Sequence, residues 1–289
     1  MRILVLTDSD LDGAGSALFI KWLYKDKLTE FVVIEVTETI LINEFTSREQ
    51  TLDGFDKVFI LDLDLKEEHI RVVDKPGVVI FDHHNCHSKN KHLYNHAKVI
   101  VEPYSSCMEL MRDKFSNTLT LTPQQEELVK YVDDYDSFKL QYGDSLKLNA
   151  VHSTYNRPKA IKFIEAFEAG FRPYNIYEKN SMKLFLKKFK DQLQNQVFIG
   201  KIKDYKVVSV FANFAVSEVA HYLITKHNAD IGIVVNLDAK VVSFRRSKTC
   251  EADVSILAKT LCKGGGSAAA GGGDLTPEFA SITKNFTPC

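Results

Sequence analysis

The sequence lacks several features that would assign it to particular classes of protein. It contains no apolar run long enough to cross a bilayer, so we expect no membrane-spanning helix. Its five cysteines are scattered and include no Cys-x-x-Cys pair. This pattern argues against a disulfide framework or a zinc site and favours a cytoplasmic protein with reduced thiols. The formal net charge is −1, so the chain is not a uniformly basic nucleic-acid coat.

The chain has 289 residues, of which 45% are hydrophobic and 26% charged, a composition typical of soluble globular proteins. The first half alternates predicted strands and helices, and this rhythm predicts an α/β fold with a doubly wound, mostly parallel sheet. A Lys-rich amphipathic helix follows a Gly-Phe-Arg-Pro break. After this helix, a second and shorter alternation of strands and helices predicts a smaller α/β domain.

Three short motifs rich in Asp and His each follow a run of apolar, mostly β-branched residues. Such runs are typical of strands that are buried on both faces of a parallel sheet. The motifs are Asp8-Ser9-Asp10-Leu11-Asp12-Gly13, Leu61-Asp62-Leu63-Asp64 and Asp82-His83-His84-Asn85. Parallel strands end on the same edge of their sheet, and open α/β sheets bind ligands at that edge. We therefore expect the side chains of the three motifs to meet in one place.

Carboxylates that crowd together at neutral pH repel one another unless a cation lies between them. The motifs therefore predict a site for two divalent metal ions. Asp10 and Asp12 are two residues apart in an extended segment and face the same side, as does Asp8. Asp62 is placed to bridge the two ions, and His83 supplies an imidazole nitrogen. This mixture of carboxylate and imidazole favours Mn²⁺, with Co²⁺ or Mg²⁺ as alternatives.

Such a centre predicts hydrolysis of a phosphate ester. Two metal ions lower the pKa of a water molecule and hold the phosphoryl oxygens during in-line attack. His84 is expected to bind the phosphate or protonate the leaving oxygen, and His84, Asp82 and Asp62 are the predicted catalytic residues. Another acidic cluster, Asp133-Asp134-Tyr135-Asp136, lies at the end of a helical segment and can complete the metal site. Asp64 and the histidines outside the triplet are expected to be structural or exposed.

The motifs resemble those of the DHH phosphoesterase superfamily, in particular its DHH–DHHA1 branch, which includes oligoribonucleases, other phosphodiesterases and RecJ-like nucleases. Asp82-His83-His84 is similar to the motif that names the family, Asp10-Leu11-Asp12-Gly13 to its first motif, and Asp62 to its second. Asp134 resembles the acidic residue of the fourth motif. We therefore predict Asp134 as the metal ligand of this cluster and Asp136 as the reserve candidate. The resemblance covers nearly the whole chain.

The resemblance also divides the chain. It implies a DHH metal-binding catalytic domain at residues 1–170, a linker helix at 171–196 and a DHHA1 substrate-binding domain at 197–289. In the last domain, a strand with an Arg-Ser pair and a helix followed by a glycine-rich loop are similar to the substrate-binding elements of the family. The predicted substrate-binding residues are Arg246, Ser247, Gly264, Gly265, Gly266 and Ser267.

General chemistry agrees with this assignment, because the backbone N–H groups of a glycine-rich loop can cradle a phosphate and an arginine can bind it with two parallel hydrogen bonds. The glycine-rich run would also suit a flexible linker, but its position after an amphipathic helix favours the loop. Two positions depart from the family pattern. Leu6 and Ser267 stand where many members have histidine.

The leading prediction is a metal-dependent phosphodiesterase that cleaves short RNA or DNA oligonucleotides, or small nucleotides, to mononucleotides. The alternatives are a RecJ-like 5′→3′ exonuclease for single strands, a phosphodiesterase for cyclic or linear dinucleotides, and a nucleotide-binding module without catalysis. The near-neutral charge argues against tracking of long strands, which relies on basic grooves. No membrane partner is expected, and the sequence is compatible with a homodimer.

Overall fold

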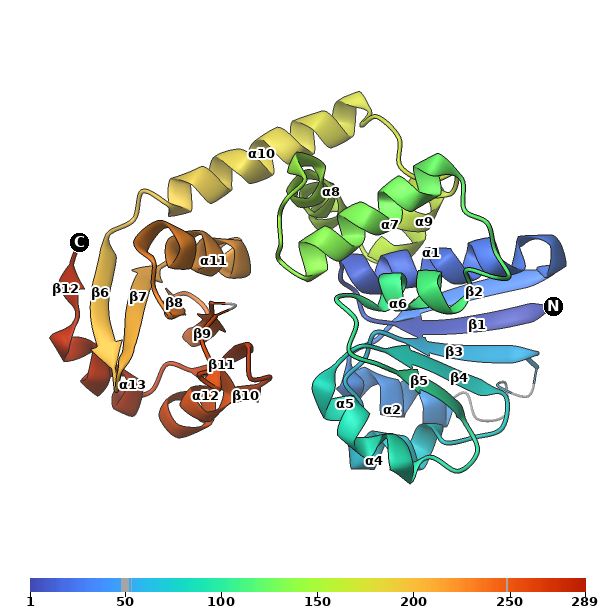
Figure 1. Cartoon of the computed structure of the whole chain (residues 1–289), viewed down its shortest axis with the longest axis horizontal. Helices are drawn as coiled ribbons and strands as arrows, with labels where there is room; N and C mark the ends of the chain where they lie inside the picture. The colour runs from blue at the N-terminus through green and yellow to red at the C-terminus, as the bar shows by residue number, and fades with distance from the viewer. Residues whose placement is uncertain (48–51, 53, 248) are drawn as a thin grey trace. The chain divides into compact units, whose positions relative to one another are not determined.

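The computed structural model of the chain describes residues 1–47, 52, 54–247 and 249–289. They form two compact units, Met1–Met182 and Lys183–Cys289. The division lies inside the long helix α10 (Ile176–Gln192), which is drawn in yellow in Figure 1. The finer assignment of a linker at residues 171–196 stays a prediction. Among the helices of the described chain, none combines the length and the apolar character that spanning a membrane requires.

The first unit is built on a five-stranded parallel sheet, with strand order β2-β1-β3-β4-β5. The strands are β1 (Arg2–Thr7), β2 (Glu30–Glu35), β3 (Lys57–Leu61), β4 (Val78–Asp82) and β5 (Lys98–Val101). In β1, Ile3 and Val5 pack into one apolar cluster, while Leu4 and Leu6 pack into another. Each strand can therefore be apolar on both faces, which explains the continuous Val/Ile/Leu runs of the sequence.

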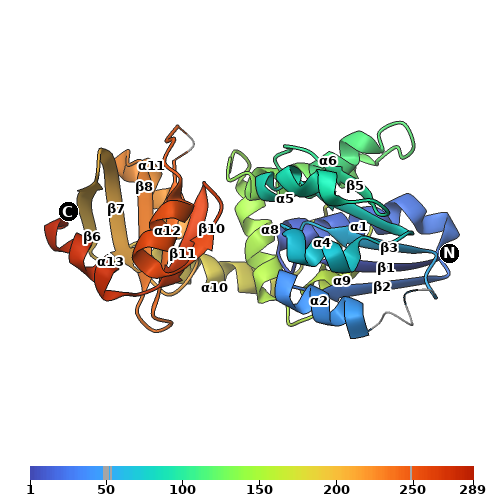
Figure 2. The ribbon, with the colours of Figure 1, turned by 90° about the horizontal axis from the view of Figure 1, so that it is seen from below.

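Helices cover both faces of this sheet, as a doubly wound fold requires, and the predicted fold class is confirmed (Figure 1). On one side lie α1 (Leu11–Tyr24), α6 (Cys107–Lys114) and α9 (Lys159–Phe167), with α7 (Pro123–Asp136) and α8 (Gly143–Thr154) packed beyond them. On the other side lie α2 (Glu38–Ser47), α4 (Glu67–Val73) and α5 (Asn85–Asn90), which stand in front of the sheet in Figure 2. Short 3₁₀ turns follow α1 at Lys25–Lys27 and α5 at Lys91–Leu93.

Helix α7 begins where the sequence predicts. Thr122 is its N-cap, and its hydroxyl accepts a hydrogen bond from the amide of Gln125. The side chain of Gln125 accepts one from the amide of Thr122 in return, and Pro123 occupies the first helical position. This capping box fixes the start of the helix whose other end carries Asp136.

The second unit contains a seven-stranded sheet with order β10-β11-β9-β8-β7-β6-β12. The strands are β6 (Val197–Ile202), β7 (Tyr205–Phe211), β8 (Ile231–Asn236), β9 (Val241–Arg246), β10 (Gly265–Gly266), β11 (Ala270–Asp274) and β12 (Thr287–Pro288). Among the described strands of this sheet, only β7 and β8 pair in parallel, and α11 (Val216–His227) connects them across one face. The opposite face is covered by α12 (Val254–Cys262) and α13 (Pro277–Ile282), which lie in front of the sheet in Figure 2. A 3₁₀ turn, Thr283–Asn285, follows α13.

The glycine-rich run is a β-hairpin rather than an open loop, which corrects the sequence prediction. Strands β10 and β11 pair with each other, and β11 also pairs with β9. A Cβ atom on Gly264 would lie 1.9 Å from the carbonyl oxygen of Gly272, and one on Gly273 would lie 2.4 Å from the carbonyl oxygen of Cys262. The glycines are therefore required by close backbone contact, and low strand propensity concealed the hairpin in the sequence.

Candidate functional site

The Asp and His motifs follow the carboxyl ends of three adjacent strands. In the sheet register, Thr7 pairs with Leu61 and Leu61 pairs with Phe81, so the three strands end at the same level. The strand order reverses between β1 and β3, and open α/β sheets bind ligands at such a switch point. The fold thus brings the three motifs together, as the sequence predicted.

Asp12 lies in the first turn of α1 and is held by the start of α6. Its side chain is buried, with Oδ2 accepting a hydrogen bond from the amide of Cys107 at 2.6 Å and Oδ1 one from the amide of Met108 at 3.0 Å. These bonds fix the carboxylate while leaving one lone pair on each oxygen for another ligand. Gly13 permits this placement, because a Cβ atom there would lie 2.5 Å from the carbonyl oxygen of Asp8.

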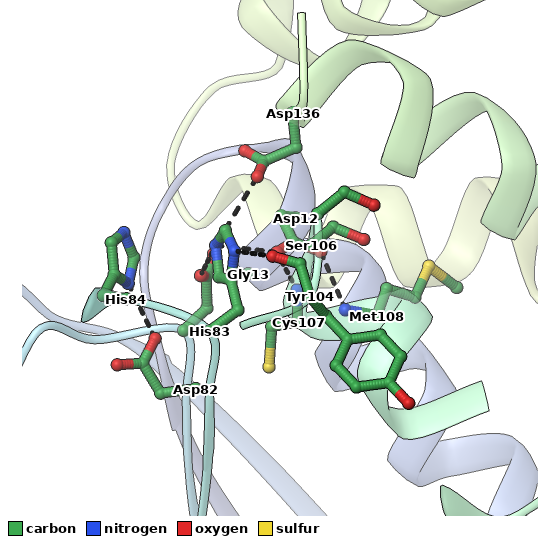
Figure 3. A network of polar contacts seen from close by, with 12 residues as sticks. Asp12, Gly13, Asp82, His83, His84, Tyr104, Ser106, Cys107, Met108 and Asp136 are labelled. Atoms are coloured by element: carbon green, nitrogen blue, oxygen red, sulfur yellow. Dashed lines mark hydrogen bonds and ion pairs between the residues drawn. The ribbon is translucent and has the colours of Figure 1, made fainter. Parts of the chain in front are cut away.

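His83 stands at the centre of the cluster (Figure 3). Its Nε2 atom lies 3.4 Å from Oδ1 of Asp62, 3.5 Å from Oδ2 of Asp136 and 3.8 Å from Oδ2 of Asp12. Its Nδ1 atom lies 3.2 Å from the carbonyl oxygen of Tyr104, which fits a proton on Nδ1 and leaves Nε2 to face the carboxylates. Helix α1, the residue that follows β3, and helix α7 therefore each direct one carboxylate at the same imidazole nitrogen.

Two groups of side chains in the described part of the chain have ligand atoms close enough for a shared ion. One consists of Asp12, His83 and Asp136, and the other of Asp62, His83 and His84. Within each group the ligand atoms lie within 4.8 Å of one another. His83 belongs to both groups, so two neighbouring metal positions are compatible with the geometry.

Asp62 combines an unusual backbone conformation with a buried side chain. It follows β3 with φ at 57°, in the left-handed region that non-glycine residues rarely adopt. Its side chain is 3% exposed, and its Oδ1 atom makes no hydrogen bond to any described residue. A buried carboxylate oxygen without a donor costs free energy unless a cation satisfies it, so this atom fits a metal ligand. Oδ1 of Asp64 is likewise buried without a described hydrogen-bond partner, although this residue was expected to be structural or exposed.

The electrostatics of the cluster also favour a cation. Burial raises the pKa of Asp12, Asp62 and Asp136, and repulsion from Asp12 and Asp10 adds to the increase for Asp62 and Asp136. Burial alone would lower the pKa of His83, but its contacts with Asp62, Asp12 and Asp136 outweigh burial and raise it to about 11. A divalent cation among these carboxylates would offset their mutual repulsion and would compete with the proton on His83.

The structure reverses the order of the two candidates in the fourth motif. Asp134 is buried and faces away from the cluster, accepting hydrogen bonds from the amides of Gln141 and Tyr142 and from the hydroxyl of Ser145. Asp136, two residues later at the end of α7, faces His83. The geometry therefore favours Asp136 over Asp134, because two residues along a helix are about 200° apart and the packing of α7 directs only the second towards the sheet edge.

Asp8 and Asp10 lie at the same edge but outside both three-residue groups. Asp10 is the N-cap of α1, and its Oδ1 accepts a hydrogen bond from the amide of Gly13 at 2.8 Å. Its carboxylate is near enough to raise the pKa of Asp62 and Asp136. The carboxylate of Asp8 accepts a hydrogen bond from the amide of Ser9. Their assignment as metal ligands stays a prediction.

Asp82 orients two histidines, of which the sequence prediction included only one. Its Oδ1 lies 2.7 Å from Nδ1 of His84, and its Oδ2 lies 2.8 Å from Nδ1 of His87. Burial raises the pKa of Asp82, but these two bonds outweigh burial and lower it to about 2. His87 is fully buried, and its Nε2 bonds the hydroxyl of Tyr94 at 2.8 Å. His84 and His87 are three residues apart, a spacing that puts two side chains on the same face of a helix, and this spacing could have indicated in the sequence that both contact Asp82.

The predicted substrate residues of the second unit gather at one end of its sheet. The amide of Arg246, at the end of β9, donates to the carbonyl of Ala269 at the tip of the hairpin, and its guanidinium donates to the carbonyl of Cys250. The amide of Ser247 donates to the carbonyl of Asp230. Ser267 closes the hairpin through its amide, which donates to the carbonyl of Ala270. Their role in substrate binding stays a prediction, as it does for Gly264, Gly265 and Gly266.

No protein-family model matches this sequence, and no curated protein sequence is significantly similar to it. Solved structures do share its fold. The pGpG-specific phosphodiesterase PggH from Vibrio cholerae is 18% identical, with a TM-score of 0.61, over 97% of this chain and 95% of that chain. The exonuclease RecJ bound to manganese is 10% identical, with a TM-score of 0.58, over 98% and 88% of the two chains.

A third similar structure is the DHH domain of a member of the s1p family of ribosomal proteins. It is 13% identical to this chain, with a TM-score of 0.56, over 94% of this chain and 82% of that chain. At these identities the likeness concerns the fold, and it extends over nearly the full length of the sequence. The chain therefore has the fold of the DHH superfamily, as its motifs predicted.

Proposed function

We propose that the protein is a phosphodiesterase that uses two divalent metal ions, Mn²⁺ by preference, to hydrolyse short oligonucleotides or small nucleotides to mononucleotides. The observation that carries the proposal is the convergence of three carboxylates on Nε2 of His83, one of them through a buried oxygen without a hydrogen bond. Such a cage has a high electrostatic cost unless it holds cations. The likeness to two phosphate-ester hydrolases, PggH and RecJ, supports the same reading.

The described residues suit two adjacent ions. Asp12, His83 and Asp136 would hold one ion, with Asp62 beside them. Asp8 and Asp10, which are predicted from the sequence and lie outside the two groups of ligand atoms, would hold the other together with Asp62. When bound, the two ions supply a hydroxide nucleophile at neutral pH and stabilise the charge on the phosphoryl oxygens. A set of carboxylates with one imidazole suits Mn²⁺ better than the all-oxygen sites typical of Mg²⁺ or Ca²⁺.

His84 is the acid in this proposal. Its Nδ1 is engaged by buried Asp82, while the side chain is 39% exposed and can reach a substrate. Burial alone would lower the pKa of His84, but the bond to Asp82 outweighs burial and raises it. A protonated His84 can bind a phosphate oxygen and then donate its proton to the leaving oxygen. Asp82 keeps the imidazole in the orientation and charge state that this step requires.

The proposed substrates are short because the chain carries little net charge and the fold neighbours include a dinucleotide-specific enzyme. Arg246, Ser247, Ser267 and the glycines of the hairpin would bind the part of the substrate that is not cleaved. The likeness to RecJ keeps a 5′→3′ single-strand exonuclease as the second candidate.

A ladder of 5′-labelled RNA and DNA, from pGpG to 20-mers, tests the proposal in the presence of Mn²⁺, Co²⁺ or Mg²⁺. We expect cleavage that is fastest on the shortest species, needs the metal and releases mononucleotides. Equal rates on short and long single strands would replace this proposal with the exonuclease. Absence of cleavage of every member, with metal bound, would indicate a nucleotide-binding module.

Two histidine variants provide the matched control. His83→Ala removes the central imidazole and should abolish both Mn²⁺ binding and cleavage. His92→Ala removes an exposed imidazole outside the cluster and should leave both unchanged. Cleavage that survives in His83→Ala would contradict the assignment of the metal centre.

A further inference from the structure

The second unit contains a cavity of about 300 Å³ between its sheet and α13. Four phenylalanine rings contribute to its walls, from Phe198, Phe211, Phe279 and Phe286. The volume is at the lower end of the range for sites that enclose small molecules. None of the lining residues in the described chain carries a charge, so the cavity does not suit a phosphate or any other ion.

Two polar side chains lie in this apolar wall, Ser209 and Thr283, and the hydroxyl of Thr283 already donates to the carbonyl of Ala280. Ser209 is on β7, between Phe198 on β6 and Ile233 on β8 in the sheet register. It is 7% exposed and lines the cavity, and its hydroxyl makes no hydrogen bond to any residue that the structure describes. This hydroxyl offers a donor and an acceptor to a molecule inside the cavity.

We propose that this cavity is a binding site for a small, uncharged, aromatic molecule of one or two rings that carries a single hydrogen-bonding group. The phenylalanine rings would pack against the faces and edges of the ligand rings, and the Ser209 hydroxyl would bond its polar group. Indole and simple phenols belong to this chemical class. All of the lining residues belong to the second unit, and none is a predicted metal or substrate residue. The site is thus additional to the proposed phosphodiesterase activity and does not depend on it.

Indole and indene are matched probes for the site, because the two molecules have nearly the same shape and only indole has an N–H group. Each is titrated into the full chain while ¹H–¹⁵N chemical shifts are recorded. We expect saturable shifts on β6, β7 and α13 for both probes, with indole binding more tightly. Shifts that centre elsewhere, or no saturable binding up to the solubility limit, would overturn the proposal.

Two variants separate the hydroxyl from the apolar wall. Ser209→Ala should weaken indole binding about fivefold, the typical effect of one hydrogen bond, and leave indene binding unchanged. Ala280→Trp places a large ring at an exposed position that lines the cavity and should abolish binding of both probes. Ser243→Ala is the matched control, since it removes a hydroxyl from β9, which β8 separates from β7, on the opposite face of the sheet.

The variants also define the outcomes that would contradict the site. Equal loss of indole and indene binding in Ser209→Ala would mean that the hydroxyl does not recognise the ligand. Unchanged binding in Ala280→Trp would mean that the probes bind outside the cavity. Concentration-dependent self-association that Ala280→Trp abolishes, without probe binding, would identify this face as a protein interface instead.

Discussion

Nδ1 of His87 lies 2.8 Å from Oδ2 of Asp82, the carboxylate whose other oxygen bonds His84. His87 is fully buried, so this bond is protected from water and fixes the carboxylate oxygen that His84 does not bond. The proposed acid is therefore oriented by a chain of side chains that runs from Tyr94 through His87 and Asp82 to His84. Outer residues of this kind commonly change activity or metal affinity by 10- to 100-fold when they are removed.

For His87→Ala, we expect kcat to fall by about 10- to 100-fold with little change in KM, because the substrate still binds while His84 is less well oriented. His87→Asn retains a donor near the position of Nδ1 and should recover most of the activity. Steady-state kinetics on the best oligonucleotide substrate would measure both. A purely structural role would instead lower the thermal unfolding midpoint of both variants without this difference in kcat.

Asp136→Asn should weaken Mn²⁺ binding by at least about tenfold, because it removes one of the carboxylates that face His83. Asp134→Asn should leave Mn²⁺ binding nearly intact and lower the free energy of unfolding by about 1–3 kcal/mol, since the buried carboxylate of Asp134 accepts three hydrogen bonds. Calorimetric titration with Mn²⁺ and urea unfolding in EDTA would measure the two effects. If Asp134→Asn weakened Mn²⁺ binding and Asp136→Asn did not, Asp134 would be the metal ligand of this cluster.

Asp62→Asn should make the metal-free protein more stable. It should also abolish the increase in stability that Mn²⁺ binding gives the wild type. In EDTA, we expect the free energy of unfolding to rise by an amount on the order of 1 kcal/mol, because a buried carboxylate near Asp12 and Asp10 is replaced by a neutral amide. Thermal unfolding with and without Mn²⁺ measures the stability of the metal-free protein and the increase that the metal gives. A loss of stability in EDTA would show that this carboxylate has a favourable partner without metal.

The buried imidazole of His152 should make the stability of the first unit sensitive to acid. Burial is the main cause that lowers its pKa to about 3, and its Nε2 has no described hydrogen-bond partner. The unfolded chain takes up a proton near pH 6.5 and the folded chain does not, so this residue reduces stability as the pH falls from about 6.5 towards 3. Between pH 7.5 and pH 5, the free energy of unfolding should fall in both proteins. We expect the fall to be about 2 kcal/mol smaller in His152→Leu than in the wild type.

Urea unfolding of the metal-free protein at the two pH values would measure this difference. His92→Leu, at an exposed histidine, is the matched control and should follow the wild type. The same pH dependence in His152→Leu and the wild type would mean that the buried imidazole is protonated in the folded protein.

Two adjacent glycines test the hairpin of the second unit. Gly264→Ala would place a Cβ atom 1.9 Å from the carbonyl oxygen of Gly272, so we expect a loss of about 1–3 kcal/mol in stability. Gly265→Ala meets no atom within 4 Å and should be nearly neutral. Urea unfolding compares the two variants. If they are equally stable, the hairpin does not form as described.

Much of the fold follows from the sequence alone, because its signals are local. Continuous apolar runs predicted the strands of the first sheet, and Thr122, Pro123 and Gln125 predicted the start of α7 from their own hydrogen-bonding chemistry. The Asp and His residues that follow three strands predicted that one sheet edge carries the site, since parallel strands end together.

The tertiary structure decided which of these residues face one another. Whether Asp134 or Asp136 points to His83 depends on the rotation of α7 against its neighbours, and two acids two residues apart give no local sign of it. The bond between His87 and Asp82 depends on how the chain turns after β4. The glycine run is a hairpin only because α12 and β9 lie close to it. Sequence patterns record residue type and spacing, whereas the direction of a side chain depends on packing between elements that are distant in the chain.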